Sequence, residues 1–300
     1  MELDTKTPVK LTEAEKKELK KRDMPGRNEE NRLLSALEAA KENRHLVILG
    51  DPGSGKSTFV NHLTLCLATH DTESCFRNRL SCWPENERNI TPVPVILRDF
   101  AQQISDREKP EAVHLWDFII ARLKTRKLDF ASQAIEDALE KGEAIVLLDG
   151  LDEISTQEKR TFVRDAVAAF AERFEKSRFI VTCRVLSYQN PEWKLDEKDF
   201  PVFELAPFDK NKIDAFINAW YEDLHRLNVI KTEQEKKTLA RRLRDAVRRP
   251  DLWRLAPNPL LLTVMTLVHC NSGSFVPALR PQSPPPDSND PGAYSRRGPA

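Results

Sequence analysis

A short glycine-rich stretch constrains the fold more than any other part of this chain. It follows the apolar run His45–Leu49 and consists of Gly50, Asp51, Pro52, Gly53, Ser54, Gly55, Lys56, Ser57 and Thr58. The stretch fits the pattern G-x-x-x-x-G-K-[ST], in which a strand leads into a tight turn that opens a helix. Backbone N–H groups of such a turn, together with the positive end of the helix, bind phosphate oxygens. The loop therefore predicts a nucleoside triphosphate site, with Lys56 at the β- and γ-phosphates and the Ser57 hydroxyl on Mg²⁺.

An acidic turn supplies the second half of such a site. The apolar strand Ala144–Leu148 is followed by Asp149, Gly150, Leu151, Asp152 and Glu153. We expect Asp149 to hold Mg²⁺, directly or through water. Asp152 and Glu153 stand where a water that attacks the γ-phosphate can be polarised. Three carboxylates this close repel one another unless a cation lies between them, which also favours Mg²⁺.

Short apolar runs alternate with amphipathic helices over residues 28–206. Strands are predicted at Leu46–Leu49, Val93–Leu97, Ala144–Leu148, Phe179–Thr182 and Val202–Leu205. Helices are predicted directly after the phosphate loop and at Glu29–Lys41, Val113–Leu123, Phe130–Leu139 and Gln157–Phe174. This alternation predicts an α/β fold, a three-layer P-loop sandwich with a parallel sheet covered on both faces.

Three further regions flank or follow this domain. Residues 1–27 are charged, and a capping box at Thr12 and Glu15 predicts a short helix, Glu13–Lys21, in a solvated arm or linker. Residues 207–271 predict a small helical domain, with Asp209 capping its first helix and Pro259 opening its last. Residues 272–300 are rich in Pro, Ser, Gly and Asp, which predicts a disordered tail.

Arg184 comes directly after the strand Phe179–Thr182 and its neighbour Cys183. In this branch of nucleotide-binding folds, that strand commonly lies between the strands that carry the phosphate loop and the acidic turn. Such an order brings Arg184 near the γ-phosphate, where it can sense whether that phosphate is present. The alternative is a solvent-facing arginine in a turn.

Taken together, these residues resemble the NACHT family of STAND signalling NTPases. The overall sequence pattern is similar to that of bacterial members. The matching motifs, in order from about Asn28 to His269, are Gly50–Thr58, Asp149–Glu153, Val181–Arg184 and Asn258–Leu262. The resemblance implies a slowly hydrolysing ATP/ADP and Mg²⁺ switch in innate immunity, cell death or antiphage defence, with self-association in full-length relatives. It also implies that Pro259 packs against the adenine. Relatives usually continue into a winged-helix domain, so we expect a truncated form or fragment.

Composition bears on the partners, the cellular compartment and the metal sites that the chain can be expected to have. Lys+Arg and Asp+Glu number 47 each, so bulk charge favours neither nucleic acid nor an anionic membrane as a partner. Five scattered cysteines without an evident secretory leader favour reduced thiols in a cytoplasmic protein. No apolar run nears the ~20 residues that span a bilayer. Zinc at His70, Cys75 and Cys82 is disfavoured because the spacing lacks a CxxC.

Three other kinds of protein share a phosphate loop of this kind. Asn211–Asp214 spells the guanine-reading motif NKxD, but it begins an amphipathic helix instead of following a buried strand, so a GTPase is disfavoured. A small-molecule kinase shares the loop but does not need the acidic turn. The third alternative is a nucleotide-gated interaction module that scarcely hydrolyses. Intact Lys56, Asp149 and Glu153 favour hydrolysis over that alternative.

Overall fold

The computed structural model describes residues 3–10, 31–69, 80, 83, 90–104 and 109–272. The described chain divides into two compact units. The first holds the residues up to Lys212 together with Pro257–Leu260, and the second holds Ile213–Ala256 and the residues from Leu261 onward. The predicted helix Glu13–Lys21, the predicted tail beyond Ser272 and the residues weighed for zinc all lie outside the described residues.

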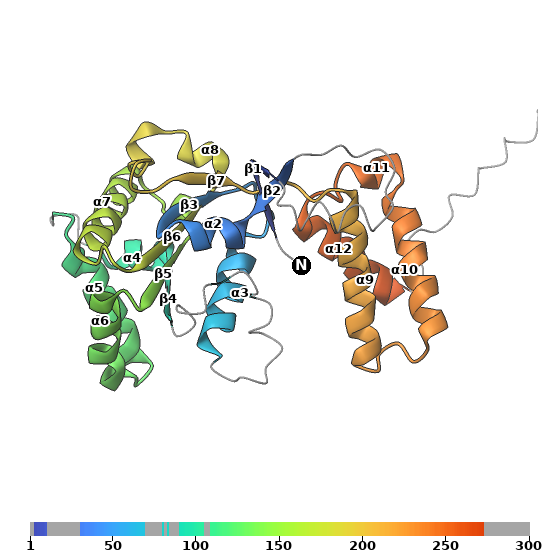
Figure 1. The fold of residues 1–300 in the computed structure, drawn as a ribbon, viewed down its shortest axis with the longest axis horizontal. Helices are drawn as coiled ribbons and strands as arrows, with labels where there is room; N and C mark the ends of the chain where they lie inside the picture. Colours follow the sequence, from blue (N-terminus) through green and yellow to red (C-terminus); the bar gives the residue numbers. More distant parts are fainter. Residues whose placement is uncertain are drawn as a thin grey trace, which may run out of the picture. The chain divides into compact units, whose positions relative to one another are not determined.

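A five-stranded parallel sheet forms the centre of the first unit (Figure 1). Its strands, in spatial order, are β4 (Thr91–Ile96), β5 (Ala144–Asp149), β6 (Arg178–Cys183), β3 (His45–Leu49) and β7 (Val202–Glu204). The predicted α/β parallel sheet is confirmed, and every strand lies within two residues of its predicted bounds. Strand β6 lies between β3 and β5, which is the order on which the placement of Arg184 depends.

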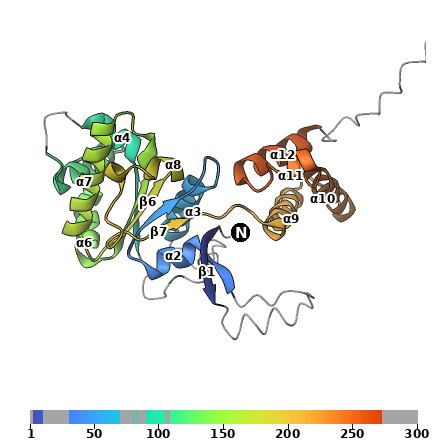
Figure 2. The same ribbon diagram turned by 90° about the horizontal axis from the view of Figure 1, so that it is seen from above.

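Helices cover both faces of the sheet, as Figures 1 and 2 show. Along β3, Leu46 and Ile48 pack into the core under α2 (Ala36–Glu42) and α3 (Lys56–Ala68). Val47 and Leu49 face the opposite core. That core is covered by α4 (Leu97–Gln103), α5 (Ala112–Thr125), α6 (Ser132–Lys141) and α7 (Gln157–Arg173). Successive strand residues thus serve opposite faces, which explains why these strands are apolar throughout.

The N-terminal part of the first unit differs from prediction. The helix predicted at Glu29–Lys41 is wrong in its first half, because β2 (Asn31–Ser35) precedes α2 and pairs antiparallel with β1 (Asp4–Lys10). Ser35 ends the strand and caps the helix: its Oγ accepts from the Glu38 amide at 3.1 Å, and its amide donates to Glu38 Oε2 at 2.8 Å. Strand β1 was not predicted, because its alternation of charged and polar residues is typical of a linker.

The edges of the sheet are not alike. At one end β4 has Pro92 and Pro94 within the strand. At the other end, β7 is followed by Leu205, which forms a bridge with Thr5 of β1. The amide of Ala206 also donates to the carbonyl of Asp4 at 2.8 Å. Strand β1 therefore partly covers the β7 side.

Four helices follow the sheet domain: α9 (Lys210–Arg226), α10 (Glu233–Val247), α11 (Pro250–Trp253) and α12 (Pro259–Ser272). Asp209 caps α9 as predicted, since its Oδ1 accepts from the Lys212 amide at 2.8 Å. Within the second unit, Tyr221 Oη and His269 Nδ1 lie 2.5 Å apart, and both side chains are buried. None of the helices in the described ranges is long and apolar enough to cross a membrane.

Candidate nucleotide site

The loop between β3 and α3 has the backbone that its glycines predict. Gly53 and Gly55 have φ of +79° and +99°, which side chains disfavour, and Gly55 is the N-cap of α3. A Cβ at Gly53 would also lie 2.7 Å from Asn258 Oδ1. Ser57 and Thr58 are exposed in the first turn of the helix. The amides of this turn have no earlier helical carbonyl to bind and are available to an anion.

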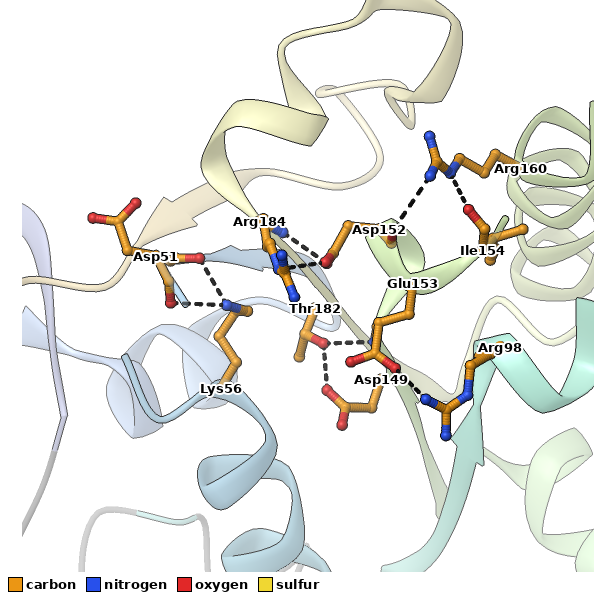
Figure 3. Close-up of polar contacts among 12 residues, drawn as sticks. Asp51, Lys56, Arg98, Asp149, Asp152, Glu153, Ile154, Arg160, Thr182 and Arg184 are labelled. Carbon is orange, nitrogen blue, oxygen red and sulfur yellow. Dashed lines mark hydrogen bonds and ion pairs between the residues drawn. The ribbon is translucent and has the colours of Figure 1, made fainter. Parts of the chain in front are cut away.

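Lys56 folds back over the loop. Its Nζ donates to the carbonyl of Gly50 at 2.7 Å and to that of Asp51 at 3.2 Å (Figure 3). Partial burial lowers the pKa of Lys56, while the carboxylates of Asp152 and Asp149 oppose that shift. An ammonium held among carbonyls and near acids can exchange these partners for phosphate oxygens.

The hydroxyl group of Ser54 indicates whether the loop fits a phosphate. Its Oγ is buried and has no hydrogen-bond partner among the described residues. A buried hydroxyl normally has a partner, and leaving one unpaired costs free energy. The unpaired hydroxyl, the glycine-shaped turn and the adjacent ammonium together fit a phosphate group.

At the carboxyl ends of β5 and β6, Asp149 and Thr182 form a connected pair. Thr182 Oγ1 donates to Asp149 Oδ1 at 2.5 Å and accepts from the Gly150 amide at 2.9 Å (Figure 3). Thr182 is fully buried, so it fixes both the carboxylate and the turn that follows it. Sequence reasoning did not assign a role to Thr182. The available signal was a lone hydroxyl in an apolar strand, one residue before its end.

Asp152 and Arg184 bind each other. Arg184 Nε lies 2.8 Å from Asp152 Oδ2, and the Arg184 amide donates to Asp152 Oδ1 at 2.9 Å. The Asp152 side chain is only 5% exposed, so both of its oxygens are occupied in a nearly buried contact. This pair joins the acidic turn to the end of β6. Cys183 is the last residue of β6, and burial raises its pKa to about 12, so that the thiol stays protonated.

Glu153 ends the short turn η4 (Leu151–Glu153) and faces a different neighbour. Its Oε2 lies 3.3 Å from the Arg98 guanidinium (Figure 3). Gly150, with φ of +83°, leaves the space that the Glu153 side chain uses: a Cβ there would lie 3.2 Å from Cγ and Cδ of Glu153. Gly150 thus makes room for the Glu153 side chain. Arg160 supports the same turn by donating to the Ile154 carbonyl at 2.6 Å.

The segment Pro257–Leu260 lies against the phosphate loop. Asn258 Nδ2 donates to the Pro52 carbonyl at 2.8 Å, and the Leu260 amide donates to the Gly53 carbonyl at 3.2 Å. Pro259 lies between these two contacts in the chain and is therefore held beside the loop. Sequence reasoning singled out Pro259 but not Asn258, whose amide bridges two segments far apart in the sequence.

Comparison with known proteins decides the family. A model of the NACHT domain matches residues 44–224, which is more than half of the 300-residue chain. The chain belongs to the NACHT family. The predicted family is thereby confirmed, and the chain is a nucleotide-binding P-loop NTPase.

Solved structures and curated sequences were also compared with this NACHT protein. It is similar to C. elegans PCH-2 at 13% identity, covering 79% of this chain and 59% of that one, with a TM-score of 0.42. Domain III of the Thermotoga maritima replication initiation protein DnaA gives 16% identity, 81% and 86% coverage, and a TM-score of 0.37. A RuvB variant from Thermotoga maritima has 14% identity, with 78% of this chain and 66% of that chain covered and a TM-score of 0.32. No curated protein sequence matches the chain.

The NKxD residues of the NACHT protein have other partners. Lys212 Nζ lies 2.7 Å from Asp4 Oδ1, within the first unit. Asp214 Oδ2 lies 3.0 Å from the guanidinium of Arg248, within the second. The carboxylate that would read guanine in a GTPase is thus engaged in an ion pair on the helical unit.

Proposed function

We propose that this NACHT protein binds ATP or ADP with Mg²⁺ and hydrolyses ATP slowly, as a signalling switch. The observation that carries the proposal is the convergence of opposite charges at the carboxyl ends of β3, β5 and β6. Lys56 comes from the first of these ends, Asp149 and Glu153 from the second, and Arg184 from the third. Ligands of open α/β sheets bind at this edge of the strands.

In this proposal the loop binds the phosphates, and Asp149 of the acidic turn helps to bind Mg²⁺. The loop Gly50–Thr58 holds the phosphates through its amides, through Lys56 and through the hydroxyl of Ser54. Ser57 and Asp149 would hold Mg²⁺, which would offset negative charge on the β- and γ-phosphates. Thr182 fixes Asp149 in place, because a ligating carboxylate is oriented by its own hydrogen bonds. The proposed role of Pro259 is to pack against the adenine.

Hydrolysis needs a group that orients water, and we assign that role to Glu153. The water oxygen attacks the γ-phosphorus, the bond to the β–γ bridging oxygen breaks, and the water proton passes to Glu153 or to the released phosphate. Asp152 contributes by holding Arg184, which places that guanidinium where it can respond to the γ-phosphate. The products are ADP and inorganic phosphate.

A second function, nucleotide-gated interaction with little hydrolysis, is favoured by one observation. Both oxygens of Asp152 are bound by Arg184, and its side chain is only 5% exposed. A carboxylate engaged in this way polarises water less readily than a free one does. On either function, we propose a cytoplasmic role in immune or antiphage signalling, with self-association, from resemblance to the family.

Nucleotide released from the purified protein tests the first step. ATP or ADP bound one-to-one supports the proposal, and GDP would revive the GTPase reading. Lys56→Ala should abolish nucleotide binding, whereas Lys41→Ala, at an exposed lysine in the last turn of α2, should not. Glu153→Gln should bind nucleotide normally and lose turnover. Unchanged phosphate release by Glu153→Gln would remove Glu153 from the mechanism, and the absence of turnover in the wild type would favour the interaction module.

A further inference from the structure

Arg98 stands beside the acidic turn because of the register of two strands. In the β4–β5 pair, Ile96 lies opposite Asp149. The chain turns into α4 directly after Ile96, so Arg98 falls in the first turn of that helix, next to the residues that follow Asp149. Its guanidinium approaches Glu153 Oε2 to 3.3 Å. In Figure 3, Arg98 reaches Glu153 on the side away from Lys56.

The Glu153 carboxylate is therefore confined from two directions. The side chain occupies the space that a Cβ at Gly150 would enter, 3.2 Å from its Cγ and Cδ, and Arg98 binds one of its two oxygens. A glutamate side chain otherwise samples several rotamers, and fixing it costs conformational entropy. The single contact through Oε2 leaves Oε1 on the Lys56 side (Figure 3).

We propose that Arg98 is a positioning residue for hydrolysis. It binds Glu153 Oε2 and thereby directs Oε1 toward the water that attacks the γ-phosphate. This inference rests on the proposed role of Glu153. Arg98 itself would contact neither the nucleotide nor the attacking water.

A second acid near Arg98, Asp99, is bound more closely by another arginine. Asp99 Oδ1 lies 3.9 Å from Arg98 Nε, and its Oδ2 lies 3.1 Å from Arg122. Arg98 and Glu153 are about half exposed, at 55% and 42% of their side chains, so the pair adds little to stability. Its effect should therefore be seen in turnover more than in folding.

The test compares Arg98→Ala, Arg98→Lys and the control Arg122→Ala. Arg122 belongs to the same charged cluster but contacts Asp99 instead of Glu153, which makes it a matched loss of a guanidinium. We expect Arg98→Ala to lower kcat about fivefold, the upper limit for a partly exposed ion pair, with nucleotide Kd unchanged. Arg98→Lys should recover part of the rate because it restores the positive charge. Arg122→Ala should keep kcat within about twofold of wild type.

A double-mutant cycle with Glu153→Gln separates positioning from a merely structural effect. Single-turnover hydrolysis is measured for the wild type, both single variants and the double variant. If Arg98 acts through Glu153, its removal has no further effect once Glu153 is Gln. The same fivefold loss in both backgrounds, or a kcat unchanged by Arg98→Ala, would overturn the role of Arg98 while leaving that of Glu153 intact. Normal turnover by Glu153→Gln alone would instead overturn both.

Discussion

Gly150→Ala should damage both the stability and the turnover of this protein, by separate routes. The φ of +83° at Gly150 suits glycine, and an L-residue adopts it at a cost of about 1–2 kcal/mol. The free energy of unfolding should fall by roughly that amount. The second route is steric, because the added Cβ would lie 3.2 Å from Cγ and Cδ of Glu153 and the side chain must move by a few tenths of an ångström.

The loss of turnover follows from that displacement. Misplacing a reacting group by about 1 Å costs on the order of a hundredfold in rate. A movement of about 0.3–0.5 Å therefore predicts a four- to tenfold fall in kcat, on a logarithmic scale. Nucleotide Kd should stay close to wild type, because no group in the phosphate loop is changed. The protein is assayed well below its thermal midpoint, so that the lost stability does not remove folded enzyme.

Gly142→Ala is the matched control for this experiment. Gly142 has φ of +78° at the end of α6, and its added Cβ would meet the Lys176 carbonyl at 2.7 Å. The strain is at least as large, but none of the site residues is involved. Urea unfolding and phosphate release are measured for both variants. The reasoning fails if Gly150→Ala keeps wild-type kcat while losing stability, or if Gly142→Ala loses kcat to the same extent.

Two further predictions concern buried polar groups. Thr182→Val keeps the shape of the side chain but removes the hydrogen bond to Asp149 and strands the Gly150 amide, so we expect a loss of about 1–3 kcal/mol of stability. The Mg²⁺ needed for nucleotide binding should also rise about tenfold, and an unaltered Mg²⁺ titration would contradict the role of Thr182. Burial, with a smaller effect of the Arg242 charge, lowers the pKa of His269 below its usual value of 6.5. As the pH falls below 6.5, His269 is therefore protonated more readily in the unfolded chain than in the native one, which lowers the stability of the native state. Wild-type stability toward urea should therefore decline between pH 7 and pH 5 more steeply than that of His269→Gln, and parallel pH profiles would refute this linkage.

The sequence sufficed for the sheet and the phosphate loop because their determinants are local. Strands such as Ala144–Asp149 are apolar up to their last residue. In the loop Gly50–Thr58, the spacing of the glycines alone predicts a tight turn. Strand β1 escaped prediction because it is defined by pairing across the chain, with Asp4 opposite Ser35. A run of Asp, Thr and Lys has no local property that distinguishes such a strand from a linker.

The partners of the acids were beyond sequence reasoning for a related reason. In a 3₁₀ turn, successive side chains are rotated by about 120°, so adjacent residues face different neighbours. Asp152 accordingly meets Arg184, while Glu153 meets Arg98. Which arginine each acid meets depends on the order β4-β5-β6 and on the register of Ile96 with Asp149. The motif identified the acids, and only the assembled sheet distinguished their surroundings.

The prolines of β4 limit how this domain can join to another copy of itself. An edge strand with free amides can template a further strand and grow into a continuous intermolecular sheet. Pro92 and Pro94 offer no N–H, which breaks the row of donors that such growth requires. On the β7 side, the contacts of Thr5 and Asp4 occupy part of the backbone next to the strand. Any self-association of the sheet domain should therefore proceed through its helices and loops instead of through strand addition at β4.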